Sequence, residues 1–95
     1  MADISVRREH GLEPDEAKQK VHDIVTDLQN DIKYIETVDW KDDGSAADIK
    51  GKGFRGEFRV DETAVQVDID LKLMAKPFKG TIAEKIESRM SNYFG

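Results

Sequence analysis

The stretch "AVQVDIDLKLMAKPFKGTIAEKIE", residues 64–87, decides the fold, because a strand pattern passes into a helix pattern without an evident loop. Its first ten residues alternate apolar and polar side chains, which predicts a strand over 64–73 with one covered and one wet face. Five side chains are expected to face inward: Val65, Val67, Ile69, Leu71 and Leu73. A shift of one residue would expose all five, so the register of this strand should be well determined.

The second part of the stretch predicts a helix. Thr81 and Glu84 match the capping box, in which two side chains satisfy backbone N–H groups at a helix start. Pro77 lacks an N–H group and is predicted to end the strand, while Phe78 is expected to plug the corner. An apolar stripe follows at helical spacing: Ile82, Ile86, Met90 and Tyr93, with Phe94 as a further candidate. The helix should therefore return onto the sheet.

A longer helix is predicted over residues 14–34. Pro14 suits a first helical turn, and Asp15 and Glu16 complement the positive end of the helix dipole. Its apolar residues recur at steps of three and four, which makes a single stripe for covering a sheet. They are Ala17, Val21, Ile24, Val25, Leu28, Ile32 and Ile35.

The remaining segments predict short strands. "DISVRRE" and "YIETVDW" alternate, and "KDDGS" is typical of a tight turn. In "AADIKGKGFRGEFRV" the apolar phase slips by one residue, which requires a bulge or a turn, and we favour a turn at about Lys52–Gly53. The order is β-α-β-β-β-α, with one strand open to subdivision. We expect a single α+β domain, residues 1–95, as a two-layer sandwich: an antiparallel sheet of about four strands with two helices on one face.

Composition narrows the possible functions. The absence of cysteine excludes disulfides and thiol chemistry, and the N-terminus lacks the apolar segment of a secretory signal. No apolar run approaches the ~20 residues of a membrane span, so the default location is the cytoplasm. The net charge of −5 argues against nucleic-acid binding.

The charge is unevenly distributed along the chain. Residues 1–48 hold 6 Lys/Arg and 13 Asp/Glu, whereas residues 49–95 hold 9 and 7. The second half therefore carries a local positive excess, including Lys50, Lys52, Arg55 and Arg59 opposite Glu57. Two interpretations stay open here: a solvated strand face, and a patch that attracts anions.

The sequence offers no recognisable catalytic constellation. None of its serines lies in a G-x-S-x-G elbow, and "GKGFRG" lacks the phosphate-loop pattern. His10 and His22 are the two histidines, without metal-ligand spacing, and both are expected to be partly exposed. Paired carboxylates such as Asp42–Asp43 fall in predicted turns. We expect no enzyme activity, no metal and no cofactor.

Three stretches resemble the putative polyhydroxyalkanoic acid system family, small bacterial proteins also described as granule-region proteins. They are "MADISVRREHGLEPDEAK", "DIKGKGFRGEFRV" and "VDIDLKLMAKPFKGTIAEKIESRM". The most specific parts are "RREHGL" and "KPFKGTI". The family-like positions are Arg8, His10, Gly11, Leu12, Gly56, Lys76, Pro77, Phe78, Lys79 and Gly80.

The resemblance implies a connection with polyhydroxyalkanoate storage but supplies no catalytic residues. We therefore expect a binding or accessory module whose partner is the granule, a granule protein or a small ligand between sheet and helices. As an alternative, the protein is an acyl or coenzyme A thioester binder or minor enzyme of the polymer pathway. The basic lip for that ligand would consist of Arg55, Arg59, Lys76 and Lys79. The long helix could also coat a granule, but the sheet needs its stripe. Oligomeric state stays open, since "DISVRRE" could pair between chains.

Overall fold

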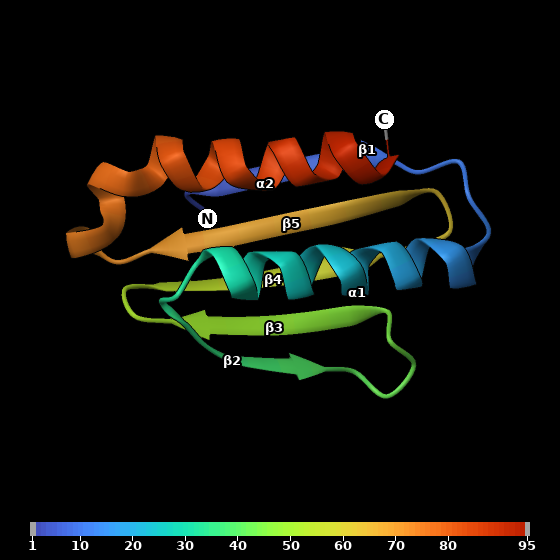
Figure 1. Ribbon diagram of the computed structural model, residues 1–95, viewed down its shortest axis with the longest axis horizontal. Coiled ribbons are helices and arrows are strands. Elements are labelled where there is room, and N and C mark those ends of the chain that lie inside the picture. Colours follow the sequence, from blue (N-terminus) through green and yellow to red (C-terminus); the bar gives the residue numbers. More distant parts are fainter. Residues whose placement is uncertain (1, 95) are drawn as a thin grey trace.

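The computed structural model describes residues 2–94, in which two helices lie against one face of a five-stranded antiparallel sheet (Figure 1). Its elements are β1 (Ile4–Glu9), α1 (Pro14–Asp31), β2 (Ile35–Trp40), β3 (Ala46–Gly51), β4 (Phe54–Val60), β5 (Ala64–Leu71), the 3-10 helix η1 (Leu73–Phe78) and α2 (Lys79–Phe94). The predicted α+β sandwich is confirmed. The sheet has five strands rather than about four because the span 46–60 is divided in two.

The strands lie in the order β1-β5-β4-β3-β2. Strands β2 to β5 follow one another as a meander, and α1 carries the chain from β1 at one edge to β2 at the other (Figure 1). Adjacent strands bring Val6, Val67, Phe58 and Ala47 into one row, and all four are buried under the helices. Side chains with the opposite orientation form an open, polar sheet face, as the strand alternation predicted.

The residue types at positions 13–16 explain why helix α1 begins at Pro14. Glu13 precedes it in extended conformation, Pro14 occupies the first turn, and Asp15 and Glu16 stand near the positive end of the dipole. The helix ends at Asp31 rather than at residue 34, because Ile32 is already extended. Its predicted stripe is confirmed from Ala17 to Leu28, with Ile32 and Ile35 half-buried. The stripe is therefore part of the core.

The turn expected at Lys52–Gly53 is confirmed between β3 and β4. Gly53 adopts a φ of +94°, which favours glycine. Gly51 is needed for another reason, because a Cβ atom there would collide with the ring of Phe54. The Phe54 ring therefore lies over Gly51, which is its register partner in β3.

The junction between β5 and α2 differs from the prediction. Strand β5 ends at Leu71, and residues 73–78 form η1, so Pro77 lies inside a 3-10 helix and does not end the strand. The Leu71 N–H donates to the Asp3 carboxylate (2.7 Å), and the Lys72 N–H donates to the carbonyl of Gly53 (2.8 Å). The Lys72 bond continues the β4–β5 register by one pair, whereas the Leu71 N–H bonds to a side chain and not to a backbone carbonyl. The 3-10 helix η1 then begins at Leu73, before the proline is reached.

Three expectations at this junction are wrong as a result. Leu73 does not face inward, and Phe78 does not plug the corner, because η1 turns both side chains into solvent. The capping box is also wrong, since α2 starts at Lys79 directly after η1 and places Thr81 inside its first turn. Further along, Ile86 and Met90 are buried as predicted.

Candidate functional site: an apolar groove at one end of the sandwich

An open groove of about 690 Å³ lies at the end of the molecule where η1 meets the C-terminal end of α1 and the β3–β4 turn. This is the left-hand end in Figure 1. Its lining is mainly apolar: Ile32, Tyr34, Phe54, Met74, Phe78 and Ile82, together with Ala75. Pockets that hold small molecules typically measure about 300–1,000 Å³, so the groove has the size of a ligand site.

Large apolar side chains around this groove are unusually exposed. The exposed fraction is 84% for Leu73, 71% for Met74, 66% for Tyr34 and 60% for Phe78. All but Leu73 line the groove, and Leu73 precedes Met74 in η1. Single exposed apolar residues are ordinary on protein surfaces, whereas a gathered patch marks an interaction site.

Backbone hydrogen bonds hold the walls of the groove in place. The Lys52 N–H donates to the carbonyl of Tyr34 (2.9 Å), which ties the β3–β4 turn to the segment before β2. Ala75 is the buried residue of η1, and a Cβ atom on Gly53 would lie 3.3 Å from the Ala75 methyl. The helix η1 is thus packed on the turn through Ala75 while its larger apolar side chains point outward.

The rim of the groove is basic. Lys33, Lys52 and Lys85 line it, against a single acidic lining residue, Asp31. The Asp31 carboxylate contacts Lys85 (3.0 Å) and Arg89 (2.7 Å), and the hydrogen bond from Lys85 is the main cause that lowers its pKa. Asp31 is therefore neutralised. Lys33 and Lys52 are exposed and form no ion pair within residues 2–94.

The interior beside the groove is nearly closed. A void of about 20 Å³ lies between the sheet and the helices, about the space of one water molecule. Ile32, Phe54 and Ile82 line both this void and the groove, so they form the partition between them. The void is too small for an acyl chain, and the ligand cleft expected between sheet and helices is thus reduced to the open groove at its end.

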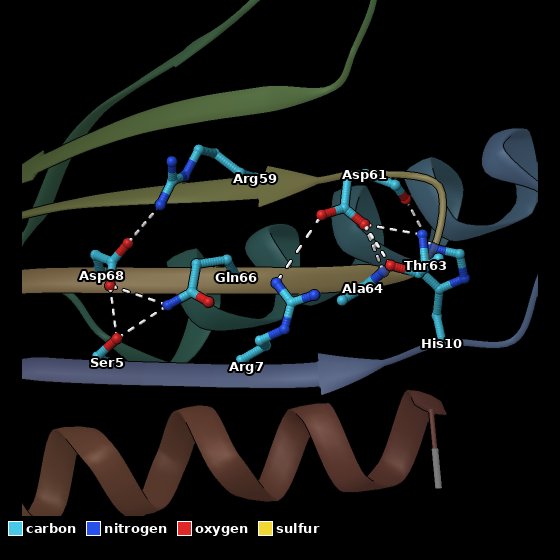
Figure 2. Close-up of polar contacts among 9 residues, drawn as sticks. All are labelled: Ser5, Arg7, His10, Arg59, Asp61, Thr63, Ala64, Gln66 and Asp68. Atoms are coloured by element: carbon cyan, nitrogen blue, oxygen red, sulfur yellow. Dashed lines mark hydrogen bonds and ion pairs between the residues drawn. The ribbon is translucent and has the colours of Figure 1, made fainter.

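The four predicted ligand-binding residues do not line this groove. Arg55 and Arg59 both lie on the open face of β4, where Arg59 pairs with Glu57 (3.1 Å). Arg59 also pairs with Asp68 (2.8 Å) (Figure 2). Lys76 lies in η1 and Lys79 begins α2. A role of these four residues in coenzyme A binding stays a prediction.

Lys76 nevertheless helps to position η1. Its ammonium group contacts the Asp3 carboxylate (3.1 Å), which also accepts the Leu71 N–H. These two bonds hold the pKa of Asp3 below its usual value, and the backbone bond from Leu71 is the larger cause. The family-like stretch that contains Lys76, Pro77, Phe78, Lys79 and Gly80 is therefore the η1–α2 junction, next to the groove.

The other family-like stretch forms the opposite end of the sandwich. His10 was expected to be partly exposed, but it is buried, with 7% exposure. Its Nδ1 accepts the Leu12 N–H (2.9 Å), and its Nε2 lies 2.8 Å from the carbonyl oxygen of Asp61 (Figure 2). Since a carbonyl only accepts, Nε2 carries the proton. Gly11 beside it has a φ of +59°. His10 thus serves as a structural link between two turns.

The second histidine and the open sheet face have local partners. His22 is exposed and stacks on Trp40, with ring centroids 5.3 Å apart. On the open face, Asp68 binds Ser5 (2.7 Å), Gln66 and Arg59 (Figure 2). The hydrogen bond from Ser5 is the main cause that lowers the pKa of Asp68.

Neither metal binding nor membrane crossing is indicated by the described part of the chain. Within residues 2–94, no group of His, Asp and Glu side chains is arranged to hold a metal ion. Neither α1 nor α2 is long and apolar enough to cross a membrane.

Sequence reasoning missed Tyr34, Met74 and Lys33 as groove residues. The available signal was the run "LMAKPF", which concentrates apolar side chains around a proline just after a strand of ordinary length.

Comparison with known proteins yields one family. Residues 4–94 match the family described as "putative polyhydroxyalkanoic acid system protein". No curated protein and no solved structure matches the chain. Because the match spans β1 to α2, the chain belongs to the family of putative polyhydroxyalkanoic acid system proteins.

Proposed function

We propose that the protein is a non-catalytic binding module of polyhydroxyalkanoate storage, which attaches from the cytoplasm to the granule surface through the groove end. The family supports the connection with the polymer system. The observation that carries the proposal is the gathering of exposed Tyr34, Leu73, Met74 and Phe78 at one end of a domain whose core is otherwise buried.

The physical driving force is the removal of apolar area from water. A polyhydroxyalkanoate surface is aliphatic, and full burial of a Leu, Met or Phe side chain contributes roughly 1.5–3 kcal/mol. The summed gain from three or four such side chains is reduced by the cost of association and ordering, so the attachment is expected to be weak and reversible. The ester groups of the polymer would meet the Tyr34 and Thr81 side chains at the groove.

Attachment through this end requires no unfolding, in contrast to granule coating by α1. The buried residues of α1 form the apolar layer that covers β4 and its neighbours. If α1 left the sheet to coat a granule, that layer and the strands beneath it would be exposed to water. The groove end already presents its apolar side chains in the folded protein.

A sedimentation assay with protein-free polyhydroxybutyrate particles tests the proposal. The wild-type protein should sediment with the particles, and the double variant Met74→Ser/Phe78→Ser should stay in solution. The matched control is Met74→Leu/Phe78→Leu, which keeps the apolar character at the same two positions and should still bind.

Two results would count against the proposal. Equal sedimentation of the serine and leucine variants would show that this end does not make the contact. Binding to native granules but not to the bare polymer would assign recognition to a granule protein instead.

A further inference from the structure

The groove joins two different chemistries. Its floor is aliphatic and aromatic, formed by Ile32, Phe54 and Ile82 where they close off the interior. Met74 provides a flexible wall that can adapt to an inserted chain. Lysines from three segments line it: Lys33 after α1, Lys52 in the β3–β4 turn and Lys85 in α2. A ligand that satisfies both parts must be amphiphilic.

The charges at the rim define the polar end of that ligand. Asp31 is already neutralised by Lys85 and Arg89, so it does not offset Lys33 and Lys52. The groove is therefore locally positive in a protein whose net charge is −5. Flexible lysine side chains suit a carboxylate, since their ammonium groups can converge on a single anionic group from separate loops.

We infer that the groove binds an aliphatic chain that ends in a carboxylate, with the chain against Met74 and Ile82 and the carboxylate at Lys33 and Lys52. The choice of chain rests on the proposed function, because a polyhydroxyalkanoate chain ends in a carboxylate and its free hydroxy acid carries the same group. The site would thus recognise the end of the polymer chain or the acid released from it. The ester-rich middle of the chain lacks this charge.

Titration with sodium octanoate, followed by backbone and methyl chemical shifts, tests the site. Shifts should concentrate in residues 31–34, 52–54 and 74–85. Methyl octanoate, which has the same chain without the charge, should bind about tenfold more weakly. Lys33→Gln/Lys52→Gln should weaken octanoate binding by a similar factor, because it removes two exposed charge contacts with the carboxylate. The matched control is Lys41→Gln/Lys50→Gln, which makes the same change in net charge at exposed positions outside the groove and should bind like the wild type.

Different results separate this inference from the proposed function. Equal affinity for octanoate and its methyl ester, or shifts outside the groove, would overturn the carboxylate site even if the protein still binds polymer particles. Octanoate binding without particle binding would support the site and contradict surface attachment.

A further arm identifies the source of the carboxylate. If the groove binds the chain end, the wild-type protein should no longer bind particles whose chain ends are methyl-esterified. They should retain it if the free acid is the ligand, and either result supports the site.

Discussion

Two methionines and two phenylalanines show how differently this chain uses the same residue types. Met90 and Phe58 are 0% and 1% exposed in the layer between helices and sheet, whereas Met74 and Phe78 are largely exposed in η1. In the first region, the side chains lie between elements that the alternating and helical patterns bring together. In the second, a short 3-10 helix packs through Ala75 and turns its larger apolar side chains outward. The difference separates apolar residues that hold the fold from those available for binding.

The largest effect is expected from truncating Phe58, with the truncation of Phe78 as its comparison. Phe58→Ala should lower the free energy of unfolding by about 3–5 kcal/mol, because it removes a fully buried ring and leaves a cavity. Phe78→Ala should change it by less than about 0.5 kcal/mol, as at other exposed positions. Urea denaturation measures both. A comparable loss for Phe78→Ala would mean that η1 is part of the core, and the contrast would break down.

The opposite end of the sandwich provides the next test, since it is closed by His10. His10→Phe should lower the free energy of unfolding by about 1–3 kcal/mol, because the Leu12 N–H and the Asp61 carbonyl lose their partner in a buried corner. His10→Asn keeps an acceptor two residues before Leu12 and should lose less. The same denaturation series measures both variants, and equal stability of His10→Phe and wild type would argue against this structural role.

A third test uses pH. Asp3 and Asp31 near the groove, and Asp61 and Asp68 elsewhere, all have a folded pKa below the ordinary value of 3.8, through hydrogen bonds to their ionised forms. A group with a depressed folded pKa adds stability above its unfolded pKa, and this stability is lost as the pH falls through the folded pKa.

The urea midpoint should therefore fall once the pH drops below about 4, where the unfolded state begins to take up protons first. Asp31→Asn should flatten this fall, and Asp42→Asn, at an exposed position in the turn between β2 and β3, serves as the control. A midpoint that is constant down to pH 2 would contradict these assignments.

The smallest effect is expected on the open sheet face. Asp68, Glu57, Asp48 and Asp39 are successive register partners across four strands, which places like charges opposite one another. Replacing exposed Asp48 by threonine removes one of these charges and adds a residue that favours strands, so it should raise the free energy of unfolding by about 0.5 kcal/mol. A thermal melt that shows destabilisation would mean that this carboxylate has a favourable partner in solution.

The sequence predicted the periodic parts of this molecule and failed at the groove, for a physical reason. Alternation in 64–71 and the stripe of 14–31 are imposed by burial, so periodicity alone places Val67 and Ile24 correctly. The same reasoning extended β5 to Leu73 because its alternation continues, although the strand ends at Leu71, whose N–H bonds to the Asp3 side chain, and η1 begins at Leu73. The groove was not predicted, since its walls come from segments far apart in the sequence and its apolar residues look like core residues there.

The central claim is that the exposed apolar side chains around η1 are not needed for folding and contact the polymer surface. Hydrogen exchange on the particle-bound protein tests this claim most directly. On polyhydroxybutyrate particles, the account predicts added protection in residues 31–34, 52–54 and 73–82, with α1 as protected as in solution. Loss of protection in residues 14–31, or new protection confined to the open sheet face, would contradict it.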